Sequence, residues 1–188
     1  FDNPEISDAE YDKIKLDILN LEKKYFFLKD LELLKNIIGS TPSNKFKKDK
    51  HLRPMLSLSN AFDKNDMIDF FKKINNFLNF ENKNISLFSE PKIDGISATL
   101  IYKKGILTKG LSRGDGIIGE DILENLKTIP SIPKYIKNKD VPKLLEIRCE
   151  IYIGKKDFLK ISDKFANPRN AAGGSLRQKN PKETSKIP

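Results

Sequence analysis

The spacing of apolar residues changes near Lys83, and this change limits the fold more than any other feature of the chain. Before it, five apolar residues recur every three or four positions, as on one face of an amphipathic helix: Ile14, Ile18, Leu21, Tyr25 and Leu28. The preceding Ser7–Glu10 has the pattern of a capping box, and Gly39 is a candidate C-cap. We therefore expect residues 1–40 to form a small helical domain.

A domain boundary and a second helix are expected before Lys83. Residues 41–50 are polar and rich in lysine, which is typical of a connection, so we assign residues 41–188 to a second domain. Within it, a helix should begin near Asp63, because apolar residues again follow at helical spacing. The side expected to be buried consists of Ile68, Phe71, Ile74 and Leu78.

Beyond this point the pattern is that of β-strands. Ile96–Tyr102 and Ile106–Leu111 flank a short Lys-Lys-Gly segment, which predicts a β-hairpin. Leu145–Ile153 alternates strictly, so its odd-numbered residues, Cys149 among them, should share one apolar face. Six of the ten glycines lie within residues 95–119, which concentrates the tight turns there. These elements indicate an α/β fold of the α+β kind.

The charge of the chain suggests a polyanionic partner. The net charge is +9 and the pI is about 9.4. The cations are 30 lysines and only 5 arginines, so each arginine is expected to mark a place where a planar, bidentate guanidinium is needed for phosphate or carboxylate. The five are Arg53, Arg113, Arg148, Arg169 and Arg177.

Several classes of protein are disfavoured by the composition. No run of about 18 apolar residues is present, so we expect no membrane span. The first five residues do not resemble a signal peptide, and because no initiator methionine is present we expect the natural N-terminus to lie further upstream. Cys149, the single cysteine, cannot form an internal disulfide or hold a structural zinc by itself, which fits a reducing cytosol. Its place on an apolar face favours packing over reactivity.

The segment Glu90-Pro91-Lys92-Ile93-Asp94-Gly95 is the strongest candidate for chemistry. If it is extended, Glu90, Lys92 and Asp94 share one face, with the amine between two carboxylates. A lysine must lose its proton to act as a nucleophile, and nearby cations promote that loss whereas carboxylates oppose it. A second cation or Mg²⁺ would therefore be needed. Taken alone, the segment also fits an exposed charged strand that leads into a glycine turn.

Other motifs surround this segment in a fixed order. They are Asp8–Asp12, His51–Phe62, Ser112–Asn125, Leu145–Glu150 and Phe165–Gln178. In this order and spacing, and with the nucleophile motif Lys92-Ile-Asp-Gly95 among them, they resemble the NAD⁺-dependent DNA ligases of bacteria over nearly the whole chain. These enzymes are covalent nucleotidyl transferases, in which the lysine of this motif takes up a nucleoside monophosphate as a phosphoramidate.

The resemblance implies a fold and a division into domains. Residues 1–40 would be the helical domain that binds nicotinamide mononucleotide, truncated at its start. Residues 41–188 would be a nucleotidyl-transferase domain of the ATP-grasp-like ligase fold, built on antiparallel β-sheets with flanking helices and truncated before its last strands. Two downstream lysines, an oligonucleotide-binding barrel and a zinc module would lie beyond residue 188.

The resemblance also implies roles for individual residues. Lys92 would be the catalytic nucleophile and Asp94 the acid that orients it. The residues that would bind NAD⁺ are Asp8, Ala9, Glu10, Tyr11, Asp12, Ser57, Leu58, Glu90, Arg113, Glu150 and Arg169. Arg169 and Arg177 would contact nucleotide or DNA phosphate. Taken alone, residues 8–12 also fit ordinary first-turn helix residues and residues 113–116 an ordinary Asp-Gly turn.

The implied reaction has three steps. Lys92 takes AMP from NAD⁺ and releases nicotinamide mononucleotide, the AMP passes to the 5′-phosphate of a DNA nick, and the 3′-hydroxyl then seals the nick. Mg²⁺, with Mn²⁺ as an alternative, is the expected metal; no residue is assigned as a direct ligand, although Asp94 and Glu150 are candidates for contact through water. Zinc is expected only downstream of this chain. The expected partner is nicked double-stranded DNA, bound by a monomer in the bacterial cytoplasm at the nucleoid.

Four departures from the family pattern stand out, and two other functions remain open. Residues 32–35 read Glu-Leu-Leu-Lys in place of an Asp-Ser-Pro-Thr-like stretch, and Pro91, Cys149 and Gly173 replace other residues. These changes affect the expected binding of nicotinamide mononucleotide more than the expected role of Lys92. The alternatives are a decayed ligase remnant that binds nucleotide or nucleic acid without catalysis, and a nucleotidyl transferase that uses ATP or GTP.

Overall fold

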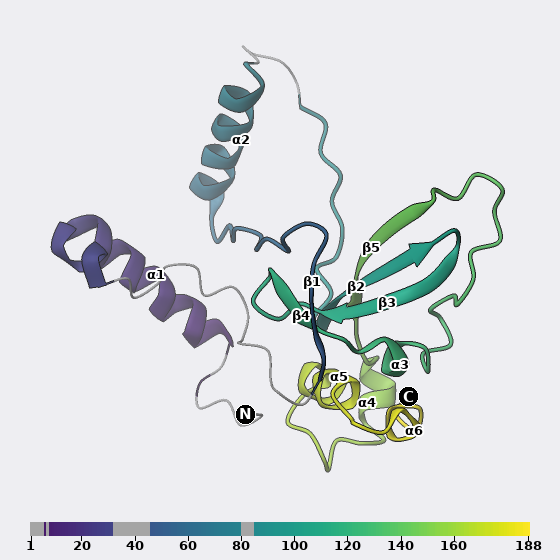
Figure 1. Cartoon of the computed structure of the whole chain (residues 1–188). Coiled ribbons are helices and arrows are strands. Elements are labelled where there is room, and N and C mark those ends of the chain that lie inside the picture. The colour runs from purple at the N-terminus through teal and green to yellow at the C-terminus, as the bar shows by residue number, and fades with distance from the viewer. Residues whose placement is uncertain (1–5, 7, 32–45, 80–84) are drawn as a thin grey trace. The chain divides into compact units, whose positions relative to one another are not determined.

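The computed structural model describes residues 6, 8–31, 46–79 and 85–188, which fall into two units (Figure 1). One unit comprises residues 1–55 together with residues 93–188, and the other is Leu56–Lys92. The chain has a mixed α/β architecture with antiparallel sheets and flanking helices, which confirms the predicted fold class. The predicted boundary between residues 40 and 41 lies outside the described residues and stays a prediction.

A three-stranded antiparallel sheet forms the centre of the larger unit. Its middle strand β2 (Ile96–Lys103) pairs with β3 (Ile106–Ser112) on one side and β5 (Leu144–Ile151) on the other. Lys104 and Gly105 connect β2 to β3 with φ values of 49° and 79°. Positive φ at both central residues is the requirement of a type I′ turn, which twists in the same sense as the flanking strands. The predicted hairpin is confirmed.

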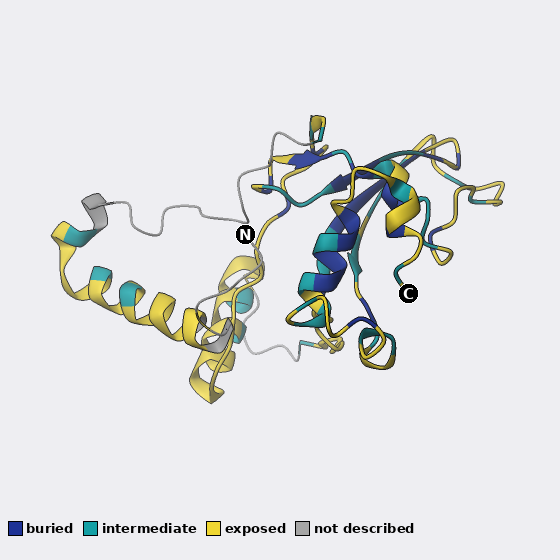
Figure 2. Cartoon of the chain, turned by 90° about the horizontal axis from the view of Figure 1, so that it is seen from below, coloured by how far each residue is buried: buried dark blue, intermediate teal, exposed yellow. Residues whose placement is uncertain are grey.

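The main hydrophobic core lies on one face of this sheet. Ala98, Leu100 and Tyr102 of β2 are buried there. Helices α3 (Leu123–Leu126), α5 (Pro168–Leu176) and α6 (Pro181–Thr184) follow in the chain, and Leu126 and Leu176 join the core cluster. Figure 2 shows the buried residues gathered on the sheet and on the helix that packs against it. Burial of these apolar side chains is what holds α5 in place beneath β2.

The predicted alternation of β5 is confirmed. Leu145, Ile147, Cys149 and Ile151 pack against the main core, and Ile153 joins a second cluster with Ile161, Ala171 and Ala172. The Cys149 thiol donates to the Ala98 carbonyl oxygen at 3.6 Å, and burial raises the pKa of this thiol. Since the reactive form of cysteine is the thiolate, the predicted packing role is also supported.

A two-stranded ribbon was missed by the sequence interpretation. Lys48–Lys50 forms strand β1, which pairs antiparallel with β4 (Ile118–Glu120). The polar, lysine-rich composition of residues 41–50 predicts a connection there, and Lys48–Lys50 has no apolar alternation that would indicate a strand. The pairing with a strand some 70 residues later is a long-range contact that a local pattern does not encode.

The helical segments agree only in part with expectation. Helix α1 (Asp8–Lys24) is followed by a 3₁₀ helix at Phe26–Leu31 and so does not continue as one α-helix towards Gly39. Ser7 of the predicted capping box, Gly39 and residues 32–35 lie outside the described residues. None of the helices in the described part of the chain is long and apolar enough to cross a membrane.

The second predicted helix is present, but its burial was wrongly predicted. Helix α2 (Lys64–Leu78) begins after Asp63, whose carboxylate accepts from the Asn65 and Asp66 amides in a capping box with Asp66. No described residue of α2 is buried. On the side expected to be covered, Phe71 and Ile74 are half-buried, whereas Ile68 is 41% and Leu78 44% exposed. The reason is that α2 is the sole helix or strand described within Leu56–Lys92, so this unit supplies no second layer.

Candidate active site

The start of β2 is joined to the first turn of α5 by an ion pair. Arg169 donates from Nη1 to Asp94 Oδ1 at 2.9 Å, and both side chains are substantially exposed. Arg169 stands in this turn because Asn167 caps α5, accepting from the Asn170 amide at 2.7 Å, and Pro168 occupies the first turn. Two predicted site residues separated by 75 positions in the sequence are thus brought into contact.

Glu150 lies beside the same end of β2. It is in register with Ser97, whose hydroxyl donates to Glu150 Oε2 at 2.8 Å. Gly95 lets β5 pass close to the backbone that directly precedes β2. A Cβ at Gly95 would clash with the Ile151 carbonyl oxygen and lie 3.0 Å from Glu150 Cγ. The glycine of the Lys-Ile-Asp-Gly segment is therefore required by the close passage of β5. Asp94 directly precedes this glycine, at the same end of β2 as Glu150.

Arg113 begins a tight loop after β3. The Gly116 amide donates to the Arg113 carbonyl oxygen at 3.0 Å, which closes the turn. Asp115 Oδ1 accepts from the Ile118 amide at 2.7 Å and from the Ile117 amide at 2.8 Å. These two hydrogen bonds lower the pKa of the Asp115 carboxyl below its ordinary value. The Asp-Gly turn is present as expected, and it sets the backbone from which Arg113 extends.

Arg177 is the C-cap residue of helix α5. Its Nε donates to the Gly173 carbonyl oxygen at 3.2 Å, within the last turn. The segment after it is fixed by Asn125, a buried residue of α3. Asn125 Nδ2 donates to the Gln178 carbonyl oxygen and to Thr184 Oγ1, both at 2.8 Å. The helix that carries Arg169 at its start thus carries Arg177 at its end, and both ends are fixed by side-chain hydrogen bonds.

Arg148, an arginine outside the site, shows what one of the scarce guanidinium groups does. Arg148 on β5 donates from Nη1 to the Pro54 carbonyl oxygen at 3.0 Å and from Nη2 to the Arg53 carbonyl oxygen at 2.8 Å. It also donates to Glu146 Oε1 at 3.3 Å. As expected, the planar guanidinium makes several hydrogen bonds at once. Its main acceptors, however, are the backbone carbonyl oxygens of Arg53 and Pro54, and these hydrogen bonds hold residues 53–54 against the sheet.

The remaining predicted site residues lie on α1 and in the Leu56–Lys92 unit. Asp8, Ala9, Glu10, Tyr11 and Asp12 form the first turns of α1. Ser57, Leu58, Glu90 and Lys92 are exposed, and residues 85–94 have no regular secondary structure. The segment through Glu90, Lys92 and Asp94 is therefore not a β-strand, and the shared face of these three residues stays a prediction. The nucleotide contacts of all these residues stay predictions.

The sequence interpretation missed His51. It lies in the His51–Phe62 motif, but the motif assigns it no role. The structure buries it to 4% exposure, with hydrogen-bonding partners on β2 and on the Arg113 loop. One signal was available: His51 is the single histidine of the chain, and a lone histidine directly after a run of lysines stands out.

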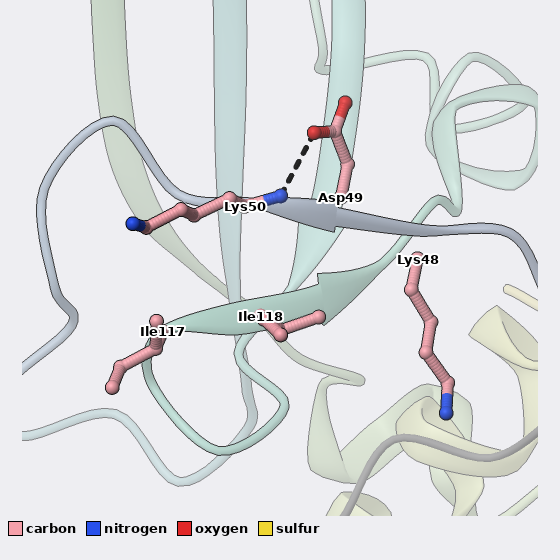
Figure 3. Close-up of a pocket in the computed structure, with 5 residues that line it drawn as sticks. All are labelled: Lys48, Asp49, Lys50, Ile117 and Ile118. Atoms are coloured by element: carbon pink, nitrogen blue, oxygen red, sulfur yellow. Dashed lines mark hydrogen bonds between the residues drawn. The ribbon is translucent and has the colours of Figure 1, made fainter.

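A hollow of about 350 Å³ lies at the β1–β4 ribbon (Figure 3). It is lined by Lys48, Asp49, Lys50, Ile117 and Ile118. Asp49 accepts a hydrogen bond from Lys109 of β3, which lowers the pKa of the Asp49 carboxyl. Ile117 and Ile118 belong to the Ser112–Asn125 motif, but none of the five lining residues is a predicted site residue. Among the described residues, no group of three or more His, Cys, Asp or Glu side chains is placed to hold a metal ion.

Comparison with known proteins decides the family. A model of the NAD-dependent DNA ligase adenylation domain matches residues 43–188. The chain belongs to this family. The resemblance inferred from the motifs is thereby confirmed, and the adenylation-domain family accounts for the antiparallel sheets and flanking helices described above.

Curated relatives of this adenylation domain carry the name DNA ligase. The protein of Pelagibacter ubique is 58% identical over 186 residues, which is 98% of this chain and 28% of the relative. Those of Rickettsia massiliae and Rickettsia bellii are each 50% identical over 199 residues, covering 100% of this chain and 28% of the relative. The chain therefore spans between a quarter and a third of the length of the relatives it matches.

Proposed function

We propose that the chain serves as the adenylation region of an NAD⁺-dependent DNA ligase, in which Lys92 accepts the adenylyl group of NAD⁺. The observation that carries the proposal is the Asp94–Arg169 pair. It links the acid two residues after the proposed nucleophile to the motif Phe165–Gln178, in a chain whose family is that of the NAD-dependent ligases. A cation thus stands beside the carboxylate that would otherwise oppose formation of a neutral lysine.

The proposed first step needs a positioned nucleophile and a stabilised phosphate. The neutral Lys92 amine attacks the adenylyl phosphorus in line, a P–N bond forms, and the P–O bond to nicotinamide mononucleotide breaks. Asp94 orients the amine, while Arg113 and Arg169 supply positive charge to the phosphate oxygens. Phosphoryl transfer depends on such positioning and electrostatic stabilisation rather than on covalent help from the protein.

Glu150 and the helical segment recognise the rest of the dinucleotide. Glu150, held by Ser97, accepts from a ribose hydroxyl of the adenylate. Glu90 lies at the adenine side of the pocket, and Ser57 and Leu58 border the bound dinucleotide. Asp8, Ala9, Glu10, Tyr11 and Asp12 bind the nicotinamide mononucleotide half, which leaves in this step. This assignment explains why the leaving group is a mononucleotide rather than pyrophosphate.

Mg²⁺ fits the carboxylates of Asp94 and Glu150 at this end of β2. It prefers oxygen ligands, keeps several waters and is usually held by one or two carboxylates plus substrate phosphates, so Asp94 and Glu150 through water would suffice. When bound, it would supply positive charge to the phosphate oxygens. Mn²⁺ is an alternative, as both are hard cations.

The later steps act on DNA. The adenylyl group passes from Lys92 to the 5′-phosphate of a nick, and the 3′-hydroxyl then displaces AMP. Arg177 and Arg169, at the two ends of α5, would hold the phosphates, and the net charge of +9 favours a polyanion. We further propose that the whole protein acts as a monomer on nicked double-stranded DNA in the bacterial cytoplasm, at the nucleoid.

The test is a covalent adduct that depends on the nucleotide supplied. The chain is incubated separately with NAD⁺, ATP and GTP, and weighed intact. A gain of one adenylyl group from NAD⁺ alone is expected. An adduct from ATP or GTP would support a different nucleotidyl transferase, and binding without an adduct would support a remnant that has lost catalysis.

A second arm removes the dependence on flanking sequence. This chain replaces the matching part of the Pelagibacter relative, and nick sealing by the chimera is measured. Lys92→Ala should abolish both the adduct and the sealing, whereas Lys139→Ala, at an exposed loop position, should leave both unchanged. A chimera that seals nicks with Lys92→Ala would remove Lys92 from its role.

A further inference from the structure

A buried histidine lies behind the loop that carries Arg113. His51, directly after β1, is 4% exposed although its ring has two polar nitrogens. A buried polar group that lacks a partner costs free energy, so the partners of this ring report what holds it there. None of the roles proposed above uses His51.

Both ring nitrogens of His51 have partners on other elements. Nε2 is 3.1 Å from the Arg113 carbonyl oxygen, and Nδ1 is 3.3 Å from Thr99 Oγ1 in the middle of β2. A carbonyl oxygen can only accept, so Nε2 must carry the proton. The ring therefore connects the centre of the sheet to the first residue of the loop.

The backbone around His51 holds the other end of the same loop. The His51 amide donates to the Ile117 carbonyl oxygen at 2.9 Å, and the Met55 amide donates to the Gly116 carbonyl oxygen at 2.8 Å. A Cβ at Gly119 would lie 3.0 Å from His51 Nε2 and would clash with the Ser112 backbone. The loop is packed against residues 51–55 without room for another side chain.

We propose that His51 is a positioning residue for Arg113. Its Nε2–H holds the Arg113 carbonyl oxygen and thereby fixes the backbone from which the guanidinium extends to NAD⁺. The effect on NAD⁺ rests on the proposed function, whereas the hydrogen bond does not. His51 itself touches no substrate in this account, and it acts only through Arg113.

The hydrogen bond is tested first, without any nucleotide. Because His51 is the single histidine of the chain, its ring nitrogens can be read without overlap in a long-range ¹H–¹⁵N spectrum. The proposal requires a proton on Nε2. A neutral ring protonated on Nδ1 would overturn it, because Nε2 could not then donate to a carbonyl oxygen.

The effect on NAD⁺ is tested with three substitutions. His51→Phe and His51→Asn should weaken NAD⁺ binding by roughly tenfold, the size expected for loss of one hydrogen bond to a buried group. His51→Gln should restore binding to within about twofold, because a Gln amide N–H can reach the position of Nε2 whereas the shorter Asn cannot. Equal loss in all three variants would overturn the proposal.

A double-mutant cycle separates positioning from general loss of structure. In an Arg113→Ala background, His51→Phe should cause no further loss of NAD⁺ binding, since the residue through which it acts is already gone. Additive losses would overturn the positioning role. If neither the wild-type chain nor the Pelagibacter chimera binds NAD⁺, the proposed function fails; if either binds and its His51 variants bind equally well, only this inference fails.

Discussion

The β2-centred sheet and helix α2 are stabilised in different ways. In the larger unit, Tyr102 of β2, Leu111 of β3 and Leu126 of α3 are fully buried, and Tyr102 and Leu126 share one core cluster although they are distant in the sequence. In α2 no described residue is buried, and its clearest signal is a capping box between Asp63 and Asp66, three positions apart. Long-range packing defines the first region, and local hydrogen bonding marks the second.

The difference extends to the candidate site. Asp94 and Arg169 pair across 75 positions, and Ser97 and Glu150 pair across 53. These residues owe their positions to the sheet and to α5. Lys92, by contrast, is exposed in a segment without regular secondary structure. The comparison indicates that the sheet supplies a fixed set of charges, whereas Lys92, the proposed nucleophile, is exposed and is connected to Asp94 through Ile93.

The largest expected loss of stability comes from truncating a side chain of the hydrophobic core. Leu126→Ala should lower the free energy of unfolding by about 2–5 kcal/mol, because a fully buried leucine leaves both lost burial and a cavity. The matched control is Leu78→Ala in α2, where the side chain is 44% exposed, and there the loss should stay below about 1 kcal/mol. Urea denaturation followed by circular dichroism measures both. Equal losses would contradict the contrast between the regions.

The next effect tests the close approach at the start of β2. Gly95→Ala should cost about 1–3 kcal/mol, because the added methyl meets the Ile151 backbone and one of the strands must move. Gly154→Ala is the control, as its Cβ would meet only Asp157 Oδ2 at 3.7 Å. The measurement is the melting temperature of each variant, compared with that of the wild-type chain. A Gly95→Ala protein as stable as Gly154→Ala would show that β2 and β5 can separate there at little cost.

A smaller effect is expected from the cap of α2. Asp63→Ala should cost about 1 kcal/mol of helix stability, since it removes the acceptor for the Asn65 and Asp66 amides. Amide hydrogen exchange should accelerate in α2 and remain unchanged in β2. The control Asp69→Ala removes only an exposed pair with Lys72 and should have less effect. Faster exchange in β2 would mean that the two regions are not independently stabilised.

The smallest effect is a pH dependence in the Arg113 loop. The folded pKa of Asp115 is lowered by the Ile118 and Ile117 amides, so its contribution to stability is present above the unfolded value of about 4 and is lost as the pH falls through the folded value. Asp115→Asn should therefore lower the melting temperature slightly at pH 7, and this difference should shrink towards pH 3. A difference that grows on acidification would contradict the assigned hydrogen bonds.

The sequence predicted the elements whose signals are local. The β2–β3 hairpin follows from two alternating runs around a turn containing Gly105, and β5 from its alternation. The start of α2 was placed at Asp63, where the cap is found. In each case a short stretch of sequence carries the whole signal, which is why these predictions are confirmed.

What the sequence could not predict depends on contacts between distant segments. Lys48–Lys50 is a strand only because β4 pairs with it, and the exposure of α2 depends on what its own unit offers for packing. Asp94, Glu150 and Arg169 were each singled out by motif, yet no pattern states that Arg169 reaches Asp94. That contact arises because α5 packs beneath β2 through Ala171 and its neighbours.

The most direct test of the account is to locate the adenylyl group on the chain. After incubation with NAD⁺, the protein or the Pelagibacter chimera is digested at low temperature and the peptides are fragmented in a mass spectrometer. The account predicts one adenylylated peptide with the group on the Lys92 side chain. An adenylyl group carried by any other residue, or its absence from both proteins, would contradict it.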